Sequence, residues 1–247
     1  IEGGLGADTL TGVDILSYAN SSNGVTVDLE AGTGSGGEAA GDTFNGFFSF
    51  IGSDHDDHVT ASLNYWNIDT GAGNDTYIGT VEDDYIYGGE GADTIDGNAH
   101  GDAGDTVDYW SSNEGIIVNL ETGAGIGGDA EGDTLINIEN VHGSYNYSNH
   151  IIGNASDNYL QGGQQADTLI GGAGNEIFNS GGYDQILIDT FNGGADYDII
   201  EFGGFESYPV LNFADLNLSN MEEILLKNGD VDLEFTAQDI INITDSN

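Results

Sequence analysis

A nine-residue repeat of the form G-G-x-G-x-D-x-U-x, where U is apolar, constrains this chain more than any other feature. Residues 3–11 (GGLGADTLT) and 88–96 (GGEGADTID) match it at every fixed position. Counting back in nines from residue 88 gives repeats that start at 79, 70, 61 and 52, with Val59, Ile68, Tyr77, Ile86 and Ile95 at the U position. A second run starts at 153, 162 and 171, with Leu160, Leu169 and Phe178 at that position, and another copy spans 193–201. Such repeats predict a solenoid, because one repeat cannot bury its apolar face alone.

A longer duplication overlies the short repeat. Asp14, Tyr18 and the triplet 41–43 (GDT) recur 91 residues later as Asp105, Tyr109 and 132–134. We therefore divide the chain into a first copy (1–87), a second copy with longer loops (88–201) and an atypical C-terminal segment (202–247).

Charge decides how such a solenoid holds together. The chain has one Lys or Arg against 44 Asp or Glu, a net charge of −43, and no Cys. Nucleic acid and anionic membranes are excluded as partners, because binding phosphate needs clustered Lys and Arg. A disulfide framework is excluded, and no apolar run reaches the ~18–20 residues of a membrane span. Its 12 Tyr, 10 Phe and 38% hydrophobic residues argue against disorder, so we expect a fold built around cations.

The repeat itself favours calcium. Glycines permit the tight turn, and the D-x-U stretch forms a short strand whose apolar residue points inward. Stacking places the carboxylates about 4.8 Å apart, where they repel unless a cation lies between them. Calcium accepts 6–8 carboxylate and carbonyl oxygens flexibly, whereas magnesium demands octahedral geometry and soft metals favour thiolates.

These motifs resemble the RTX (repeat-in-toxin, haemolysin-type) calcium-binding proteins. The resemblance implies an all-β fold, a right-handed parallel β-roll or β-helix solenoid, with several calcium ions between the turns of repeats n and n+2. It implies these first-turn ligands: Asp75 with Gly71 and Gly73; Asp84 with Thr80 and Glu82; Asp57 with Ser53 and His55; Asp93 with Gly89 and Gly91; Asp167 with Gly163 and Gln165; Asp8 with Gly4 and Gly6; and Glu176 with Gly172 and Gly174, followed by Asp198. Asp75 would face Gly88, Glu90 and Ala92. Asp84 would face the turn beginning at Gly97, and Asp57 would face Thr70, Ala72 and Asn74.

Some positions depart from the pattern. Trp66 stands where repeat 61–69 should have Asp, so a site there should be empty or weak, and Asn158 and Glu176 also replace Asp. Asp42 and Asp133, in the duplicated turns, are either further ligands or parts of a solvated acidic turn.

Two clusters allow other interpretations. The run Asp54-His55-Asp56-Asp57-His58 is either a transition-metal or catalytic group, or a solvent-facing pair of histidines on a calcium repeat. Trp110 with Tyr145 and Tyr147 forms either a sugar-stacking platform or ordinary strand packing. The sequence shows no G-x-S-x-G elbow for a nucleophile.

The C-terminal segment reads as strands near 216–218, 224–226 and 231–233, and then a short helix from residue 240. Its TAQD sequence (236–239) resembles segments of large RTX adhesins.

The sequence therefore predicts a calcium-binding structural module, without catalysis of its own, of a large secreted or cell-surface bacterial RTX protein. We expect a monomeric, adhesin-related module that folds on extracellular calcium after type I secretion and is a piece of a longer chain. The alternatives are a carbohydrate-binding module that recognises polysaccharide or cell-surface glycan, and the C-terminal roll of a secreted polysaccharide-active enzyme or protease.

Overall fold

A computed structural model describes residues 1–12, 14–62, 67–180, 188–203, 216–228 and 231–236, with backbone only for 202–203, 226–228 and 231–234. The chain forms two compact units: unit 1 is Ile1–Tyr109 with Gly123–Ile138, and unit 2 is Trp110–Thr122 with Glu139–Asn247. Trp66, Pro209, residues 237–239 of the TAQD sequence and the helix expected from residue 240 lie outside the described residues.

Unit 1 consists of short strands in two sheets, with orders β1-β5-β4-β3-β7-β9-β11-β15-β14 and β2-β6-β8-β10-β12. Its elements are β1 (Thr9–Thr11), β2 (Ile15–Ser17), β3 (Thr26–Asp28), β4 (Thr33–Ser35), β5 (Thr43–Asn45), β6 (Ser49–Ile51), β7 (His58–Thr60), β8 (Asn67–Asp69), β9 (Thr76–Ile78), β10 (Tyr85–Tyr87), β11 (Thr94–Asp96), β12 (Thr106–Asp108), β14 (Ala124–Ile126) and β15 (Thr134–Ile136), with short 3₁₀ turns η1 (Gly37–Ala39) and η2 (Gly128–Ala130).

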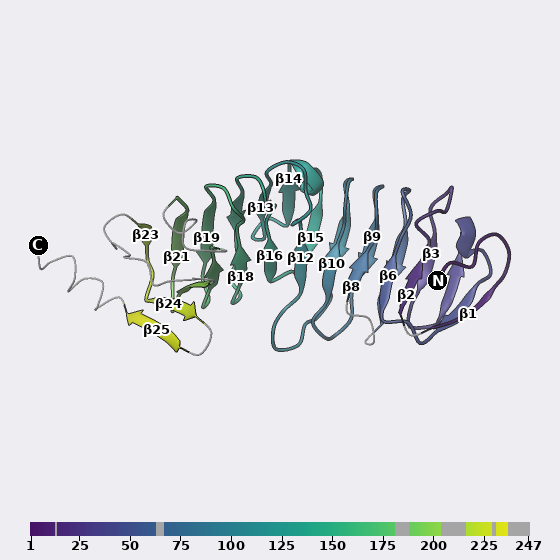
Figure 1. Cartoon of the computed structure of the whole chain (residues 1–247), viewed down its shortest axis with the longest axis horizontal. Coiled ribbons are helices and arrows are strands. Elements are labelled where there is room, and N and C mark those ends of the chain that lie inside the picture. The colour runs from purple at the N-terminus through teal and green to yellow at the C-terminus, as the bar shows by residue number, and fades with distance from the viewer. Residues whose placement is uncertain (13, 63–66, 181–187, 204–215, 229–230, 237–247) are drawn as a thin grey trace, which may run out of the picture. The chain divides into compact units, whose positions relative to one another are not determined.

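Unit 2 has the sheet orders β13-β17-β19-β21-β23 and β16-β18-β20-β22-β24-β25. Its strands are β13 (Ile117–Asn119), β16 (Asn140–His142), β17 (His150–Ile152), β18 (Tyr159–Gln161), β19 (Thr168–Gly172), β20 (Ile177–Asn179), β21 (Thr190–Gly194), β22 (Ile199–Gly203), β23 (Asn217–Ser219), β24 (Glu223–Asn228) and β25 (Val231–Thr236). The last two form an antiparallel hairpin, drawn in yellow in Figure 1. The three expected C-terminal strands are therefore present.

Each nine-residue repeat contributes one strand, and consecutive strands alternate between the two sheets. Within the regular repeats, neighbours in a sheet are thus 18 residues apart: Val59 pairs with Tyr77, which pairs with Ile95, all in parallel register. The short strands lie side by side in each unit (Figure 1). This arrangement confirms the predicted all-β, parallel β-roll architecture.

The U residues form the core of the regular repeats. Val59, Ile68, Tyr77, Ile86, Ile95, Leu160, Leu169, Phe178 and Ile200 are each at most 2% exposed. Every coil therefore buries one apolar residue from each sheet, and stacking makes the two rows continuous.

The 91-residue duplication recurs as structure. Strands β3 and β13, strands β5 and β15, and turns η1 and η2 begin 91 residues apart. The described residues contain no helix long and apolar enough to span a bilayer.

Candidate metal-binding turns

The turns that precede the strands stack, and their carboxylates form a ladder. The backbone N–H of Asp57 donates to Oδ1 of Asp75 at 2.7 Å, and that of Asp75 donates to Oδ1 of Asp93 at 2.8 Å. The N–H of Asp93 donates in turn to Oδ1 of Asp133 at 2.9 Å. Each carboxylate thus uses one oxygen to hold the preceding turn, which leaves the other oxygen for a further partner.

That second oxygen is buried and lacks a protein partner at the centre of the ladder. Asp75 is 2% exposed and Asp93 is 1% exposed, and Oδ2 of each accepts no hydrogen bond from any described residue. Burial, reinforced by neighbouring carboxylates, raises the pKa of Asp75 to about 7 and the pKa of Asp93 to about 8. A buried carboxylate without a counter-charge costs several kcal/mol, and the chain has only one Lys or Arg. The donor set fits a hard, oxygen-binding cation.

Glycines bring backbone carbonyls to the same place. Gly89 and Gly91 have φ values of +89° and +148°, and a Cβ on them would lie 1.7 Å from the carbonyl oxygen of Gly71 and 1.6 Å from that of Gly73. A larger residue would therefore force adjacent turns apart. The N–H of Gly73 donates to the carbonyl of Glu90 at 2.8 Å. The structure accordingly brings the predicted first turn 71–75 against the predicted facing turn 88–92.

Other predicted turn pairs are also adjacent. The N–H of Ala72 donates to the carbonyl of Ser53 at 3.1 Å, which joins turn 70–74 to turn 53–57. The N–H of Ala99 donates to the carbonyl of Thr80 at 3.3 Å, which joins the turn beginning at Gly97 to turn 80–84. Which oxygens bind each ion stays a prediction.

In unit 2, Glu176 and Asp198 repeat the pattern. The N–H of Glu176 donates to Oδ1 of Asp198 at 3.0 Å. Both side chains are fully buried, and both Glu176 oxygens and Oδ2 of Asp198 lack a hydrogen-bond partner within the described ranges. Burial is the main cause that raises the pKa of both carboxyl groups. Two buried carboxylates this close together repel each other, so a cation beside them would stabilise the turns. The N–H of Ala195 donates to the carbonyl of Gly172 at 3.0 Å, so turns 172–176 and 194–198 are stacked.

The structure supplies partners for three first-turn residues whose facing residue the sequence did not identify. The N–H of Asp8 donates to Oδ1 of Asp42 at 2.8 Å, and Oδ2 of Asp8 is buried without a partner. Asp93 faces Asp133, as described above. The N–H of Asp167 donates to Oδ1 of Asp189 at 2.9 Å; residues 181–187, which precede Asp189, lie outside the described part of the chain. Gly163 and Gln165 lie on the Asp167 turn, with the Gly163 N–H donating to Oδ2 of Asp167.

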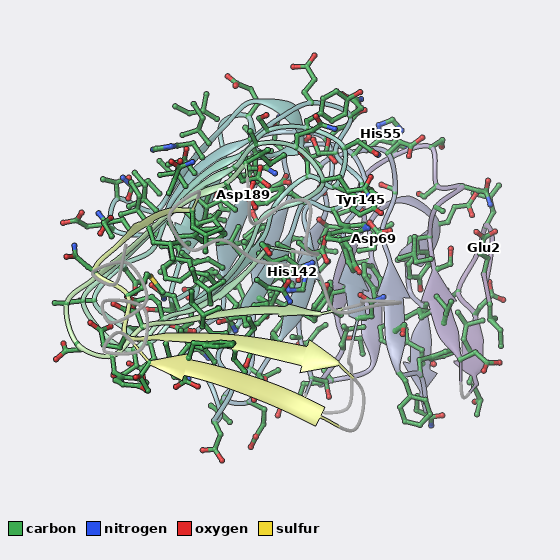
Figure 2. All side chains as sticks on the ribbon, turned by 60° about the vertical axis from the view of Figure 1, so that its left-hand side comes forward. Glu2, His55, Asp69, His142, Tyr145 and Asp189 are labelled. Carbon is green, nitrogen blue, oxygen red and sulfur yellow. The ribbon has the colours of Figure 1, made fainter. Side chains whose placement is uncertain are left out.

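Three acidic residues of the ladders were not identified from the sequence as candidate ligands. Asp189, labelled in Figure 2, is fully buried, its Oδ2 has no partner, and burial raises its pKa to about 8. Asp105 accepts the N–H of Asp84 at 2.8 Å, and Glu222 accepts the N–H of Asp198 at 2.8 Å. Asp189 and Asp105 each begin a D-x-U triplet, which was a usable signal, but Glu222 belongs to no motif.

Asp42 and Asp133 differ from Asp75 and Asp93 in having a tyrosine partner. Oδ2 of Asp42 accepts the hydroxyl of Tyr18 at 2.9 Å, and Oδ2 of Asp133 accepts the hydroxyl of Tyr109 at 2.7 Å. Both oxygens of each carboxylate are therefore hydrogen-bonded within the protein. Asp57, Asp84 and Asp167 also accept hydrogen bonds at both oxygens, so the tyrosine hydroxyl donor, rather than full hydrogen bonding, sets Asp42 and Asp133 apart. This donor favours a structural role for both residues.

At two ladder positions an asparagine stands in place of aspartate, and its amide donates hydrogen bonds to the oxygens around it. Nδ2 of Asn149 lies 2.9 Å from the carbonyl oxygens of Ser144 and Tyr147 and 2.9 Å from Oδ1 of Asp167. Nδ2 of Asn158 donates to the carbonyl of Glu139 at 2.9 Å. These amide groups hold their turns where other repeats have a carboxylate.

The cluster 54–58 does not converge on one point. Asp57 is buried within the ladder, whereas Asp54, His55 and Asp56 are exposed, and His55 lies at an outer edge of the ribbon (Figure 2). No group of three or more His, Asp or Glu side chains able to hold a metal occurs within the described ranges. The arrangement favours sites made of one carboxylate per turn together with backbone carbonyls.

The predicted aromatic cluster is assembled. The rings of Trp110 and Tyr145 have centroids 4.5 Å apart, and Tyr147 is exposed on the same loop as Tyr145.

Fold and turns together define a β-roll repeat protein with cation-binding turns. Residues 69–105 and 145–182 match the family model described as RTX calcium-binding nonapeptide repeat (4 copies). The chain thus carries RTX-type calcium-binding repeats, and calcium is the cation of these repeats. A search of the curated proteins found no match. Repeats of this type are structural rather than catalytic.

Proposed function

We propose that this chain is a calcium-folded structural module of a secreted or surface-anchored bacterial RTX protein, with an adhesin-related role as a monomeric piece of a longer chain. Its copies would be residues 1–87 and 88–201, closed by segment 202–247. The ions would lie between successive turns, with Asp57, Asp75, Asp84, Asp93, Asp167 and Glu176 as first-turn ligands.

The observation that carries the proposal is the pair of buried Oδ2 atoms on Asp75 and Asp93, which have no partner. In a chain of net charge −43, such a ladder repels itself unless calcium is present, so binding free energy becomes folding free energy. At low calcium inside a cell the chain would stay extended, which suits export through a narrow channel. Extracellular calcium modules have dissociation constants of about 10⁻⁴–10⁻³ M.

The test is a calcium titration of the EGTA-treated, dialysed chain, followed by far-ultraviolet circular dichroism and size-exclusion chromatography. We expect strand signal and compaction to appear with a midpoint of about 0.1–1 mM calcium, and magnesium to be far less effective. An unchanged spectrum after calcium removal would refute folding by ligation. A midpoint below about 1 μM would refute the secretion part, because cytosolic calcium would then fold the chain before export.

A matched pair of variants locates the effect. Asp93→Asn removes a buried ladder charge, and Asp102→Asn removes an exposed charge from the loop 98–104. Native mass spectrometry should show at least one ion fewer for Asp93→Asn and the wild-type number for Asp102→Asn. Equal ion counts in all three proteins would exclude Asp93 as a ligand.

A further inference from the structure

Trp110, Tyr145 and Gln164 occupy corresponding places on three successive turns of unit 2. The N–H of Tyr145 donates to the carbonyl of Trp110 at 3.2 Å, and the N–H of Gln164 donates to the carbonyl of Tyr145 at 2.7 Å. The two rings stack with their planes tilted by 32°, and the Gln164 amide donates to the Tyr145 hydroxyl. The backbone thereby fixes a row of ring, ring and amide, which we call the aromatic row; Figure 2 labels Tyr145 within it.

The aromatic row is open to solvent. Trp110 is 37% exposed, and Tyr147, on the loop that follows Tyr145, is 43% exposed. Exposed amides flank the rings at Asn146, Gln164 and Gln165. The surface therefore combines flat apolar ring faces with amide groups that can both donate and accept hydrogen bonds.

The sequence stretch that carries Tyr145, Tyr147 and Gln164 has few acids in an otherwise highly acidic chain. Residues 140–156 contain no Asp, Glu, Lys or Arg and form the longest acid-free stretch of the sequence. From residue 140 to residue 166 the only acid is Asp157. A cationic ligand would find no counter-charge in this stretch, and a polyanion would be repelled by the chain as a whole.

The first copy of the duplication shows that the fold does not require the aromatic row. It builds equivalent turns with Ala19 in place of Trp110, Asp54 in place of Tyr145 and Ala72 in place of Gln164. The equivalence follows from matching hydrogen bonds: Asp57 accepts the N–H of Val25, and Asn149 accepts that of Ile116. Ile116 follows Val25 by 91 residues, whereas Asn149 follows Asp57 by 92, so the second copy has one extra residue in this turn and Gln164 corresponds to Ala72 by the 92-residue spacing. Strand packing alone therefore does not account for the two rings.

The loop that carries Tyr145 and Tyr147 is held by an amide rather than by an ion. Nδ2 of Asn149 reaches the carbonyls of Ser144 and Tyr147 and a carboxylate oxygen of Asp167, each at 2.9 Å. The loop is thus ordered in advance, which lowers the entropy cost of binding a ligand on it.

We propose that Trp110, Tyr145, Tyr147 and Gln164 form a binding platform for a neutral polysaccharide. Pyranose rings stack on the exposed aromatic faces, and the flanking amides bond their hydroxyl groups. This activity goes beyond the calcium-dependent structural role, since it assigns the second copy a ligand that the first copy does not bind.

Isothermal titration of the full chain in 2 mM calcium tests the proposal, with neutral gluco-, manno- and galacto-oligosaccharides of six units and a polyuronate of equal length as probes. We expect at least one neutral hexasaccharide to bind. Trp110→Ala and Tyr145→Asp, which copy the residues of the first copy, should each weaken that binding at least tenfold. Phe48→Ala, which removes a ring in unit 1 that is 45% exposed, should not change it.

Absence of binding by every neutral probe, tighter binding of the polyuronate, or an equal loss in Phe48→Ala would overturn the proposal. Circular dichroism and ion counting confirm that each variant is folded and loaded with calcium, so failure here is distinct from failure of calcium-dependent folding. A Trp66→Phe variant leaves Trp110 as the only tryptophan, and its fluorescence should shift to shorter wavelength when the sugar binds.

Discussion

At the scale of single residues, a tyrosine hydroxyl occupies the second oxygen of the last carboxylate in two acidic ladders, those that end at Asp42 and Asp133. Tyr109 donates to Asp133 at 2.7 Å, and burial, reinforced by the Asp133 charge, raises the pKa of this phenol, which stays a donor. Tyr109→Phe should lower the free energy of unfolding in saturating calcium by about 1–3 kcal/mol, because one buried carboxylate oxygen loses its partner. Urea denaturation measures this. Tyr147→Phe, whose side chain is exposed, is the control; unchanged stability of Tyr109→Phe with an unchanged ion count would contradict the assignment.

Asn149 offers a converse test. Asn149→Asp restores the residue type found at Asp57 but removes the amide that holds Ser144, Tyr147 and Asp167. We expect the variant to bind one calcium ion more than the wild type by native mass spectrometry, since a carboxylate and freed carbonyls then converge. Its calcium midpoint should also rise, because a like charge now faces Asp167. Asn146→Asp adds the same charge to an exposed part of the loop and should alter neither quantity.

At the scale of elements, the close approach of stacked turns is the sharpest constraint. Gly91 and Gly6 both have positive φ, but a Cβ on Gly91 would lie 1.6 Å from the Gly73 oxygen, whereas Gly6 has open space around it. Gly6→Ala should cost about 1 kcal/mol, the penalty for a left-handed backbone alone. Gly91→Ala should cost several times more, measured as the shift in calcium midpoint and melting temperature. Equal effects would show that the turns separate without cost.

The spacing of elements also shows where sequence reasoning works and where it fails. Regular nonapeptides predicted the strands and every buried U residue from Val59 to Ile95, because a fixed 18-residue coil ties spacing to register. Asp189 was missed because it follows Asp167 by 22 residues, although Leu169 and Phe191 still pair in register. Extra residues between two paired strands cost little entropy. The strands can therefore keep their pairing register even where the number of residues between them departs from 18. The donor role of Asn149 needs side-chain geometry that no spacing encodes.

At the scale of the whole molecule, the requirement for cations could be predicted from composition alone, since one Lys or Arg cannot balance 44 acids. The structure shows which of these negative charges are buried without a counter-charge. Asp75, Asp93, Asp189, Asp198 and Glu176 are buried, each with an oxygen that accepts no hydrogen bond from the residues that the structure describes. Screening by salt acts on exposed charges and leaves such buried oxygens largely unaffected, so simple salts should not substitute for calcium.

Protons, in contrast, should substitute in part. Burial raises the pKa of Asp93 to about 8, that of Asp75 to about 7 and that of Asp133 to about 6, against about 3.9 in an unfolded chain. The metal-free fold therefore binds protons more tightly than the unfolded chain does. Their contribution to stability is fully present below the unfolded pKa and is lost as the pH rises through about 6–8. Calcium competes for the same oxygens, so its affinity should rise over that range.

We accordingly expect the metal-free chain to gain strand signal when the pH is lowered from 8.5 to 5.5, as measured by circular dichroism after exhaustive removal of calcium. At pH 8.5, 1 M sodium chloride should restore less of that signal than acid does, because it screens repulsion without neutralising the buried carboxylates. In 2 mM calcium the signal should depend little on pH across the same range. A metal-free signal that is constant, or that increases towards pH 8.5, would mean that the buried carboxylates are not what unfolds the chain when calcium is absent.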